Sequence, residues 1–268
     1  MNREKFILFM DSGVGGLSIL KNFLAIKVDT DIIYYADNQN FPYGNKNNGY
    51  IGELLYNIYL NLSNNYHISL ISIVCNTASV SALKILREKV SIPIIGTIPA
   101  IKPAARITKK NRIGIIATSN TINLDYLPNL INKFASDKKV YIKSSEKLAS
   151  IVERFYSKSE IDKILDKELS YFKNKDIDVL VLGCTHYSFL KEEISNYFKN
   201  KVIILDSIDG VTNRIIDLMK DIDYSKNHNR ILFLSKSDND ASAKYQEISD
   251  KFKLFNKIII EDLSCQKV

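Results

Sequence analysis

The hydrophobic residues of this chain gather in short uniform runs rather than in strictly alternating positions. Ten such runs, rich in β-branched residues, lie at residues 6–10, 31–37, 70–76, 92–98, 112–118, 139–145, 178–184, 201–207, 230–235 and 257–263. Uniform runs of this length are typical of strands that are buried on both faces, as in parallel sheets. We therefore predict ten strands in mostly parallel sheets.

Helical spacing of apolar residues appears between many of these runs. The clearest case is residues 50–62, where apolar side chains recur three and four positions apart. A similar stripe covers residues 161–172, and we expect one helix over residues 187–197, soon after Cys184. Strands that alternate with helices predict an α/β fold.

Two stretches of the chain resemble each other. Residues 71–83 and 179–190 each contain a buried run, a cysteine, a threonine close behind it and then a helical pattern. The two cysteines, Cys75 and Cys184, are 109 residues apart, and residues 6–13 resemble the stretch that begins at Arg112 at nearly the same offset. This repetition predicts two similar α/β units.

The repeated pattern also predicts where a ligand would bind. In open α/β sheets, ligands bind beyond the carboxyl ends of the strands. Asp11, Cys75, Thr118 and Cys184 all follow or end a predicted strand. If the two units face each other, both thiols line one cleft between them.

Composition narrows the classes of protein that remain. The 268 residues are 46% hydrophobic and 25% charged, as in ordinary globular proteins, and no apolar run approaches the roughly 20 residues that cross a bilayer. The N-terminal run reads as a first strand rather than a secretory signal, which favours the cytoplasm. The net charge is +7, but the lysines are dispersed and no nucleic-acid-binding motif is present. We expect neither a membrane nor a nucleic acid as a partner.

The cysteines do not form a disulfide framework. There are three of them and no CxxC pair, and the three histidines are too scattered to predict a zinc site. Cys265 lies in a polar C-terminal stretch and is interpreted as packed or exposed. Cys75 and Cys184 differ from it because polar residues follow each of them at a strand end.

Two opposed thiols can invert a stereocentre. A thiol next to a helix N-terminus is expected to have a lowered pKa, so one thiolate can take a proton while the other thiol returns one from the far side. His186 is placed to tune or relay protons for Cys184. A Cys–His hydrolase is the alternative, but residues this close in sequence rarely face each other, and it leaves Cys75 without a role.

Two loops add polar candidates. The glycines at 13, 15 and 16 do not have the GxGxxG spacing, so a small anion or amine suits this loop better than a nucleotide. Asp11 is placed to hold an ammonium group or to help deprotonate a thiol, although capping a helix is an equally good role for it. Residues 42–44 read as a rigid turn that offers backbone N–H groups, although a plain turn without a binding role is the simpler interpretation of this loop by itself.

Taken together, these motifs resemble the glutamate racemases, a family of amino acid racemases that need no cofactor. The resemblance runs over nearly the whole chain and rests on "DSGVGGLSIL", "FPYGNK", "VCNTASVSAL" and "GCTHYSFL", in the family's order and spacing. It implies two pseudo-symmetric α/β domains with the active site in the cleft between them. The first domain would comprise residues 1–97 with 207–268, and the second residues 98–206.

The resemblance also implies roles for individual residues. Cys75 and Cys184 are the paired acid and base, and Asp11, His186 and Glu153 assist them, without a metal or cofactor. The implied substrate contacts are Asp11, Ser12, Tyr43, Gly44, Asn76, Thr77, Thr118, Thr121, Thr185 and His186. This chain departs from the family pattern at Ser145 and Glu146, where a Cys-Pro pair is usual, and at Leu124, near which the family tends to have a serine.

The implied reaction is the interconversion of L- and D-glutamate, which supplies D-glutamate for peptidoglycan. Family members vary in how they dimerise, so the resemblance implies a homodimer only in general and not how its two chains meet. Two alternatives remain open. An aspartate racemase of the same superfamily would use the same thiols, and a two-domain binding protein would explain the cleft but not the matched cysteines.

Overall fold

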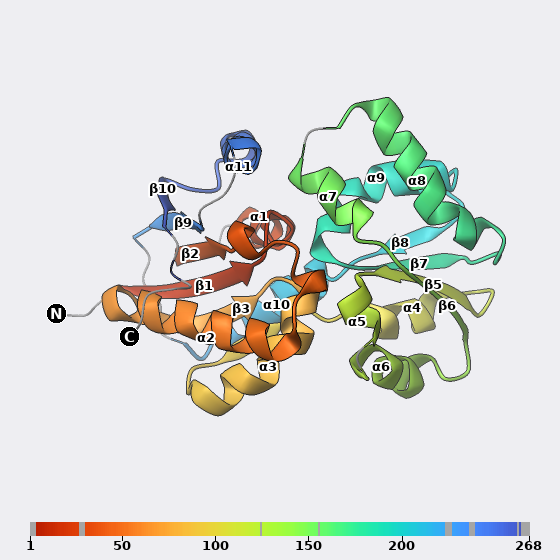
Figure 1. The fold of residues 1–268 in the computed structure, drawn as a ribbon. Coiled ribbons are helices and arrows are strands. Elements are labelled where there is room, and N and C mark those ends of the chain that lie inside the picture. The colour runs from red at the N-terminus through yellow and green to blue at the C-terminus, as the bar shows by residue number, and fades with distance from the viewer. Residues whose placement is uncertain are drawn as a thin grey trace.

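The computed structural model of the chain describes residues 4–26, 30–123, 125–154, 156–222, 227–235, 239–261 and 263. Its strands form two parallel sheets, which lie side by side in Figure 1. We call the six-stranded sheet with its helices the first half of the molecule, and the four-stranded sheet with its helices the second half. Leu124 and Cys265 lie outside the described residues.

The strands of both sheets follow from the uniform apolar runs. The first sheet has the order β10-β9-β2-β1-β3-β4 and the second has the order β6-β5-β7-β8, and all neighbouring strands are parallel. The strands are β1 (Lys5–Asp11), β2 (Asp31–Ala36), β3 (His67–Ile73), β4 (Ile94–Gly96), β5 (Arg112–Ala117), β6 (Lys139–Ser144), β7 (Val179–Gly183), β8 (Ile203–Leu205), β9 (Arg230–Leu234) and β10 (Lys257–Ile260). Each of the ten predicted runs overlaps one of them.

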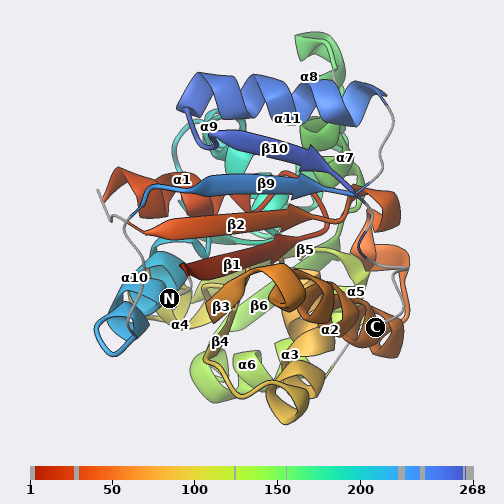
Figure 2. The same cartoon turned by 90° about the vertical axis from the view of Figure 1, so that its left-hand side faces the viewer.

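The two sheets repeat one arrangement. The order β2-β1-β3-β4 of the first sheet matches β6-β5-β7-β8 of the second, so that β1 corresponds to β5 and β3 to β7. The remaining strands, β9 and β10, extend the first sheet beyond β2, as Figure 2 shows. The prediction of two similar, pseudo-symmetric α/β units with mostly parallel sheets is therefore confirmed.

Helices cover the faces of the sheets. They are α1 (Leu17–Ala25), α2 (Asn48–Asn65), α3 (Asn76–Lys89), α4 (Ile101–Ile107), α5 (Ser119–Asn123), α6 (Tyr126–Ala135), α7 (Lys147–Glu153), α8 (Lys158–Lys173), α9 (Lys191–Tyr197), α10 (Ile208–Met219) and α11 (Asn239–Phe252). Within the described part of the chain, three short 3₁₀ helices accompany them: η1 (Asn38–Asn40), η2 (Tyr43–Asn45) and η3 (Thr185–Leu190).

Burial on both faces explains why the strands are uniformly apolar. In β1, Ile7 and Phe9 join one hydrophobic cluster, while Phe6, Leu8 and Met10 join another on the opposite face. The first cluster includes side chains of α1, α10 and α11, and the second includes side chains of α2 and α3. Neither face of the strand is left to water, so neither face needs polar residues.

The segment after Cys184 is not the single helix that we predicted. It is the 3₁₀ helix η3 followed by α9, which begins at Lys191. The N–H of Tyr187 donates to the carbonyl of Cys184, a spacing of three residues that tightens the first turn. Tyr187 and Ile194 of the predicted stripe are buried, so the apolar pattern was correct although the helix type was not.

The chain crosses between the halves twice, after β4 and again after β8. The two crossings touch, because the hydroxyl of Ser207 donates a 2.8 Å hydrogen bond to the carbonyl of Ile98. The domain bounds at residues 97 and 207 stay a prediction. Within the described ranges, no helix is both long and apolar enough to span a bilayer.

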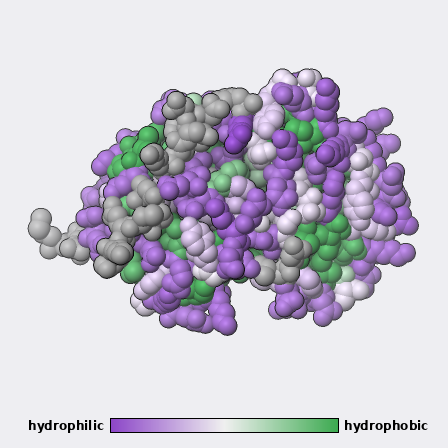
Figure 3. All heavy atoms as spheres, in the orientation of Figure 1, coloured by the Kyte–Doolittle hydropathy of each residue, from purple (hydrophilic) through white to green (hydrophobic). Residues whose placement is uncertain are grey.

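The face of the molecule seen in Figure 3 is mainly hydrophilic, with separate apolar areas on both halves. Figure 3 shows this distribution and a notch between the halves at the lower edge of the molecule. The core sits inside each half and also joins them, since one hydrophobic cluster contains Phe9 of the first half and Leu182 of the second. The two halves therefore share packed apolar contacts as well as the polar ones described next.

Candidate active site

The predicted site residues gather where strands of both halves end. Asp11 is the last residue of β1, and Cys75 lies two residues beyond β3 as the N-cap of α3. In the second half, Thr118 directly follows β5 and Cys184 directly follows β7. Parallel strands end at the same edge of a sheet, so each half brings its cysteine beside the end of its first strand.

Cys75 is surrounded by hydroxyl and carboxylate groups of the first half. Its Sγ lies 3.9 Å from the hydroxyl of Ser12, and the carboxylate of Asp11 is close enough to act on its charge. Burial raises the pKa of the Cys75 thiol well above its ordinary value, and the negative charge of Asp11 raises it further. The prediction of a lowered pKa at this thiol was wrong, because burial outweighs the N–H of Ala78 in the first turn of α3.

The carboxylate of Asp11 is held by the loop that follows it. One oxygen accepts the N–H of Gly13 at 3.1 Å, and the other accepts the N–H of Gly16 at 2.5 Å. That second oxygen also accepts the hydroxyl of Thr185 from the other half, at 3.4 Å. Burial raises the pKa of Asp11 to about 6, with the charge of His186 acting in the opposite direction. Asp11 thus stabilises the loop and remains titratable near neutral pH.

Cys184 belongs to a chain of three polar groups in the second half. Its Sγ lies 3.7 Å from Nδ1 of His186, and Nε2 of that ring lies 2.6 Å from Oε1 of Glu153. Burial alone would lower the pKa of His186, but the contacts with Cys184 and Glu153 raise it well above its ordinary value. Cys184 and His186 therefore do face each other, against the expectation for residues so close in sequence, because η3 turns the ring back toward the sulfur.

The glycine loop brings the two halves together rather than cradling a phosphate. The N–H of Val14 donates a 2.7 Å hydrogen bond to the same oxygen of Glu153 that contacts His186. A Cβ at Gly13 would collide with Glu153, and a Cβ at Gly15 would collide with His186. Only glycine lets this backbone approach the His186–Glu153 pair so closely.

Three threonine hydroxyls meet between the halves. Oγ1 of Thr77 lies 2.8 Å from Oγ1 of Thr118, which in turn lies 2.9 Å from Oγ1 of Thr121. Thr77 belongs to the first turn of α3, whereas the other two come from the loop and helix after β5. All three are buried, so they form a polar cluster inside the interface between the halves.

Asn76 is the predicted contact whose polar atoms are most evidently unused. Its side chain is 1% exposed, and within the described part of the chain neither its amide nitrogen nor its amide oxygen has a hydrogen-bond partner. Together with Cys184 and Thr185 of the second half, it lines a narrow gap that has no room for a water molecule. A buried amide without partners is costly, so Asn76 is a candidate for binding a polar ligand.

Tyr43 and Gly44 lie on the rim of this region. The hydroxyl of Tyr43 donates a 2.7 Å hydrogen bond to Asp37, which is fully buried. A Cβ on Gly44 would lie 3.5 Å from Cβ of Thr118, so the loop rests against the threonine cluster. The loop after β2 therefore forms one wall of the site.

Some residues around the site were missed by sequence reasoning. Asp37 follows β2 directly, so the same rule on strand ends that selected Asp11 would have found it. Tyr34 donates from its hydroxyl to the carbonyl of Gly13 at 2.9 Å, but its sequence position marks only a buried strand. The amide of Asn120 bonds two backbone carbonyls of the other half, and no local pattern predicts that contact.

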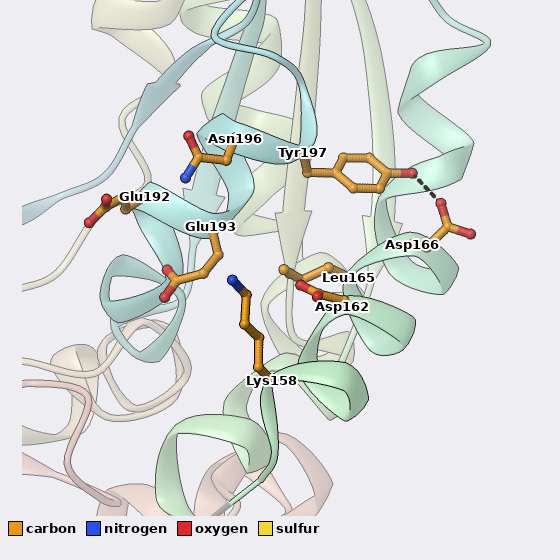
Figure 4. A pocket seen from close by; sticks show the side chains of 8 residues that line it. All are labelled: Lys158, Asp162, Leu165, Asp166, Glu192, Glu193, Asn196 and Tyr197. Atoms are coloured by element: carbon orange, nitrogen blue, oxygen red, sulfur yellow. Dashed lines mark hydrogen bonds between the residues drawn. The ribbon is translucent and has the colours of Figure 1, made fainter.

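A metal site is not found among the described residues, where no three His, Cys, Asp or Glu side chains are grouped to hold an ion. A wider groove lies elsewhere, between α8 and α9, and Figure 4 shows its lining. Its side chains are Lys158, Asp162, Leu165, Asp166, Glu192, Glu193, Asn196 and Tyr197. None of them is a predicted site residue, so the groove is separate from the paired thiols.

Comparison with known proteins agrees with this arrangement. Residues 55–214 match the family model described as Asp/Glu/Hydantoin racemase. The chain is 38% identical over 259 residues to a glutamate racemase of Histophilus somni, covering 96% of this chain and 97% of that one. It is 37% identical to a glutamate racemase of Buchnera aphidicola, covering 92% and 96% of the two chains.

Solved structures agree as well. The crystal structure of Escherichia coli glutamate racemase in complex with L-glutamate and an activator matches with a TM-score of 0.86 and 28% identity, over 97% of this chain and 98% of that one. The chain therefore belongs to the Asp/Glu/hydantoin racemase family and is an amino acid racemase, an isomerase. The resemblance to the glutamate racemases within that family is confirmed by the same comparisons.

Proposed function

We propose that this chain interconverts L- and D-glutamate, with Cys75 and Cys184 as the paired acid and base. One observation carries the proposal. Two buried thiols occupy matching strand ends of the two halves, and each has its own partners for proton transfer. A two-domain binding protein would not need both thiols, so their matched placement favours chemistry over binding alone.

The reaction moves one proton on each face of the substrate. With L-glutamate, the thiolate of Cys184 takes the α-proton and leaves a carbanion at the α-carbon. The thiol of Cys75 then gives its proton to the opposite face, which yields D-glutamate and a thiolate at Cys75. The reverse direction exchanges the two roles. The assignment of faces to the two cysteines follows the resemblance to the family.

The partners of each thiol fit these roles. A protonated His186 beside Cys184 attracts a negatively charged sulfur, and Glu153 keeps the ring charged and in place. On the other side, Asp11 is placed to take up the proton of Cys75 when D-glutamate is the substrate, with the hydroxyl of Ser12 as the relay between thiol and carboxylate. The thiols carry the protons, so we expect catalysis without pyridoxal phosphate, metal or nucleotide.

The substrate contacts are proposed for the polar groups between the thiols. The unpartnered amide of Asn76 and the first turn of α3 suit a carboxylate, because a helix N-terminus attracts anions. The other proposed contacts are Ser12, Tyr43, Gly44, Thr77, Thr118, Thr121, Thr185 and His186. Supply of D-glutamate for peptidoglycan, a cytoplasmic location and a homodimer stay predictions from the resemblance.

Named relatives support glutamate as the proposed substrate. The Escherichia coli structure contains L-glutamate, and the Francisella tularensis glutamate racemase, with a TM-score of 0.79 and 26% identity, was solved in complex with D-glutamate. Because both enantiomers occupy such proteins, we extend glutamate to this chain. Aspartate remains the competing substrate, since it differs by one methylene group and needs the same two thiols.

Exchange of the α-proton into deuterated water tests the proposal. The protein is dialysed against a chelator and incubated without cofactor, with L- and D-glutamate and L- and D-aspartate in separate reactions. We expect each glutamate enantiomer to acquire deuterium and to convert into the other. Faster conversion of aspartate would replace glutamate as the substrate, and activity that returns only with pyridoxal phosphate or a metal would contradict the thiol mechanism.

A further inference from the structure

An amide side chain of the second half holds a loop of the first half. Asn120 lies in the first turn of α5, and its Nδ2 donates to the carbonyl of Tyr43 at 3.1 Å and to the carbonyl of Lys46 at 2.8 Å. Both carbonyls belong to the segment of η2, in which Lys46 N–H also donates to the Tyr43 carbonyl at 3.0 Å. One side chain thus binds both ends of a short turn.

The turn that carries Asn120 is itself fixed. Oε1 of Glu146 accepts the backbone N–H of Ser119 at 2.7 Å, which ties the start of α5 to the loop after β6. On the other side of the contact, Gly44 rests against Thr118. The amide therefore sits where the proposed binding loop meets the threonine cluster, at a partly buried position.

Asn120 differs from the other polar contacts between the halves. The bonds from Val14 to Glu153 and from Thr185 to Asp11 are buried and use groups that we assign to catalysis. Asn120 instead binds only main-chain carbonyls, so it has no part in proton transfer. Its bonds are only partly buried, so they lie nearer the surface than the contacts of Glu153 and Asp11.

We propose that Asn120 is a latch, a positioning residue that holds the loop of residues 43–46 against the second half both before and after substrate binds. This inference rests on the proposed function for the place of the substrate. The loop carries Tyr43 and Gly44, which we propose as substrate contacts, so loss of the latch weakens the hold on the substrate. The thiols and their partners stay in place, so proton transfer within the bound complex is unaffected.

Kinetics of variants test the latch. Asn120→Ala removes two hydrogen bonds, and we expect KM for both glutamate enantiomers to rise about tenfold while kcat stays within about twofold. Asn120→Asp should raise KM further, because a carboxylate oxygen would face carbonyl oxygens that the amide now binds. Asn129→Ala, at an exposed position on α6, is the matched control and should keep wild-type KM and kcat.

Hydrogen–deuterium exchange of the unliganded protein gives a second measurement that needs no substrate. We expect amides of residues 43–46 to exchange faster in Asn120→Ala than in the wild type or in Asn129→Ala, with the melting temperature close to that of the wild type. Unchanged exchange in this loop, or a loss carried by kcat instead of KM, would overturn the latch. A wild-type protein that does not racemise glutamate would overturn the proposed function, and the exchange measurement would still judge the latch.

Discussion

Cys75 and Cys184 occupy the same place in two similar halves, yet their surroundings differ. Cys75 faces the hydroxyl of Ser12 and the charge of Asp11, whereas Cys184 faces the ring of His186. The repeated fold therefore positions both thiols but does not set their charges. The side chains beside the thiols differ between the halves: Thr118 stands at the strand end that matches Asp11, and Thr77 follows Cys75 at the spacing at which His186 follows Cys184.

The difference predicts how the resting site is charged. At neutral pH, Asp11 is mostly ionised, Cys75 keeps its proton and His186 carries a positive charge. Cys75 is thus ready to act as an acid, and the sulfur of Cys184 has a cation beside it. With the proposed assignment of faces, we expect the resting enzyme to be prepared for L-glutamate.

Racemisation alone cannot reveal this asymmetry. The two enantiomers of glutamate have equal free energies in solution, so kcat/KM must be the same in both directions for any variant. An irreversible reaction that uses one face avoids this constraint. Elimination of chloride from the separate enantiomers of β-chloroglutamate reports each thiol by itself, and the predictions below use it.

The largest effect is expected from removing either thiol. A serine hydroxyl is a much weaker acid than a thiol, so Cys75→Ser and Cys184→Ser should each lower racemisation by about 10²- to 10⁴-fold. Cys75→Ser should still eliminate chloride from the L-enantiomer, and Cys184→Ser from the D-enantiomer.

Cys265→Ser is the control for both thiol variants and should racemise normally. Near wild-type racemisation by either active-site variant would rule out the two-thiol mechanism. Reversed preferences for the enantiomers would leave that mechanism standing but exchange the faces.

The next effect concerns the cation beside Cys184. His186→Asn removes the charge that attracts a negative sulfur, so we expect racemisation to fall by about 10²-fold without unfolding. Elimination from the L-enantiomer should fall with it, and elimination from the D-enantiomer should change little. His67→Asn, at an exposed position, is the control. Equal losses with both enantiomers would show that the two thiols share one set of partners.

The role of the Asp11 carboxylate can be tested by the pH dependence of elimination from the D-enantiomer. Asp11 has a pKa of about 6, so below this pH it is protonated and cannot take the proton of Cys75. The rate of elimination from the D-enantiomer should therefore fall as the pH drops through about 6. In Asp11→Asn this elimination should be slow at every pH and should not show the fall near pH 6. Asp125→Asn, on the surface, should keep it. A profile that is flat across pH 6 in the wild type would contradict the role of Asp11.

Asp11→Asn should also stay folded. A pKa that rises from 3.8 to about 6 means that ionising Asp11 costs the folded state about 3 kcal/mol at neutral pH. The raised pKa means that protonated Asp11 favours the folded state. Its contribution to the free energy of unfolding is complete below pH 3.8 and is lost as the pH rises through about 6. A neutral asparagine avoids this cost, which offsets part of what its altered hydrogen bonds lose. Thermal unfolding of the variant measures this balance.

The smallest effect is expected at Glu153. Glu153→Gln keeps an acceptor for the N–H of Val14 but removes the charge beside His186, so turnover at neutral pH should fall only about threefold. The pKa of His186 should drop, and the alkaline limb of kcat/KM should move to lower pH. The exposed Glu192→Gln is the control. An unmoved alkaline limb would mean that Glu153 serves only to join the halves.

The fold could be predicted because burial on both faces leaves a uniform apolar run, and all ten runs became strands. The type of the helix after Cys184 could not, because Tyr187 keeps the same apolar stripe in a 3₁₀ turn and in an α-helix. The motifs placed both thiols correctly at strand ends. The pKa of Cys75 was predicted in the wrong direction, because the helix terminus was considered and the complete burial was not.

The partners of the site residues were harder to predict. Val14 and Glu153 meet although 139 positions separate them, and neither lies in a pattern that points to the other. The bond from Asn120 to the loop at Tyr43 is of the same kind. Such contacts depend on how the halves sit against each other, and hydrophobic periodicity carries no information about that placement.

The closeness of the glycine loop to the second half has a consequence for how this sequence can change over generations. Gly15 and His186 occupy space that admits no additional methyl group, and the same is true of Gly13 and Glu153. A mutation at one member of either pair is tolerated only if the other shrinks or moves at the same time. We therefore expect descendants of this gene to keep both pairs or to alter them together, so that covariation would record the contact between the halves.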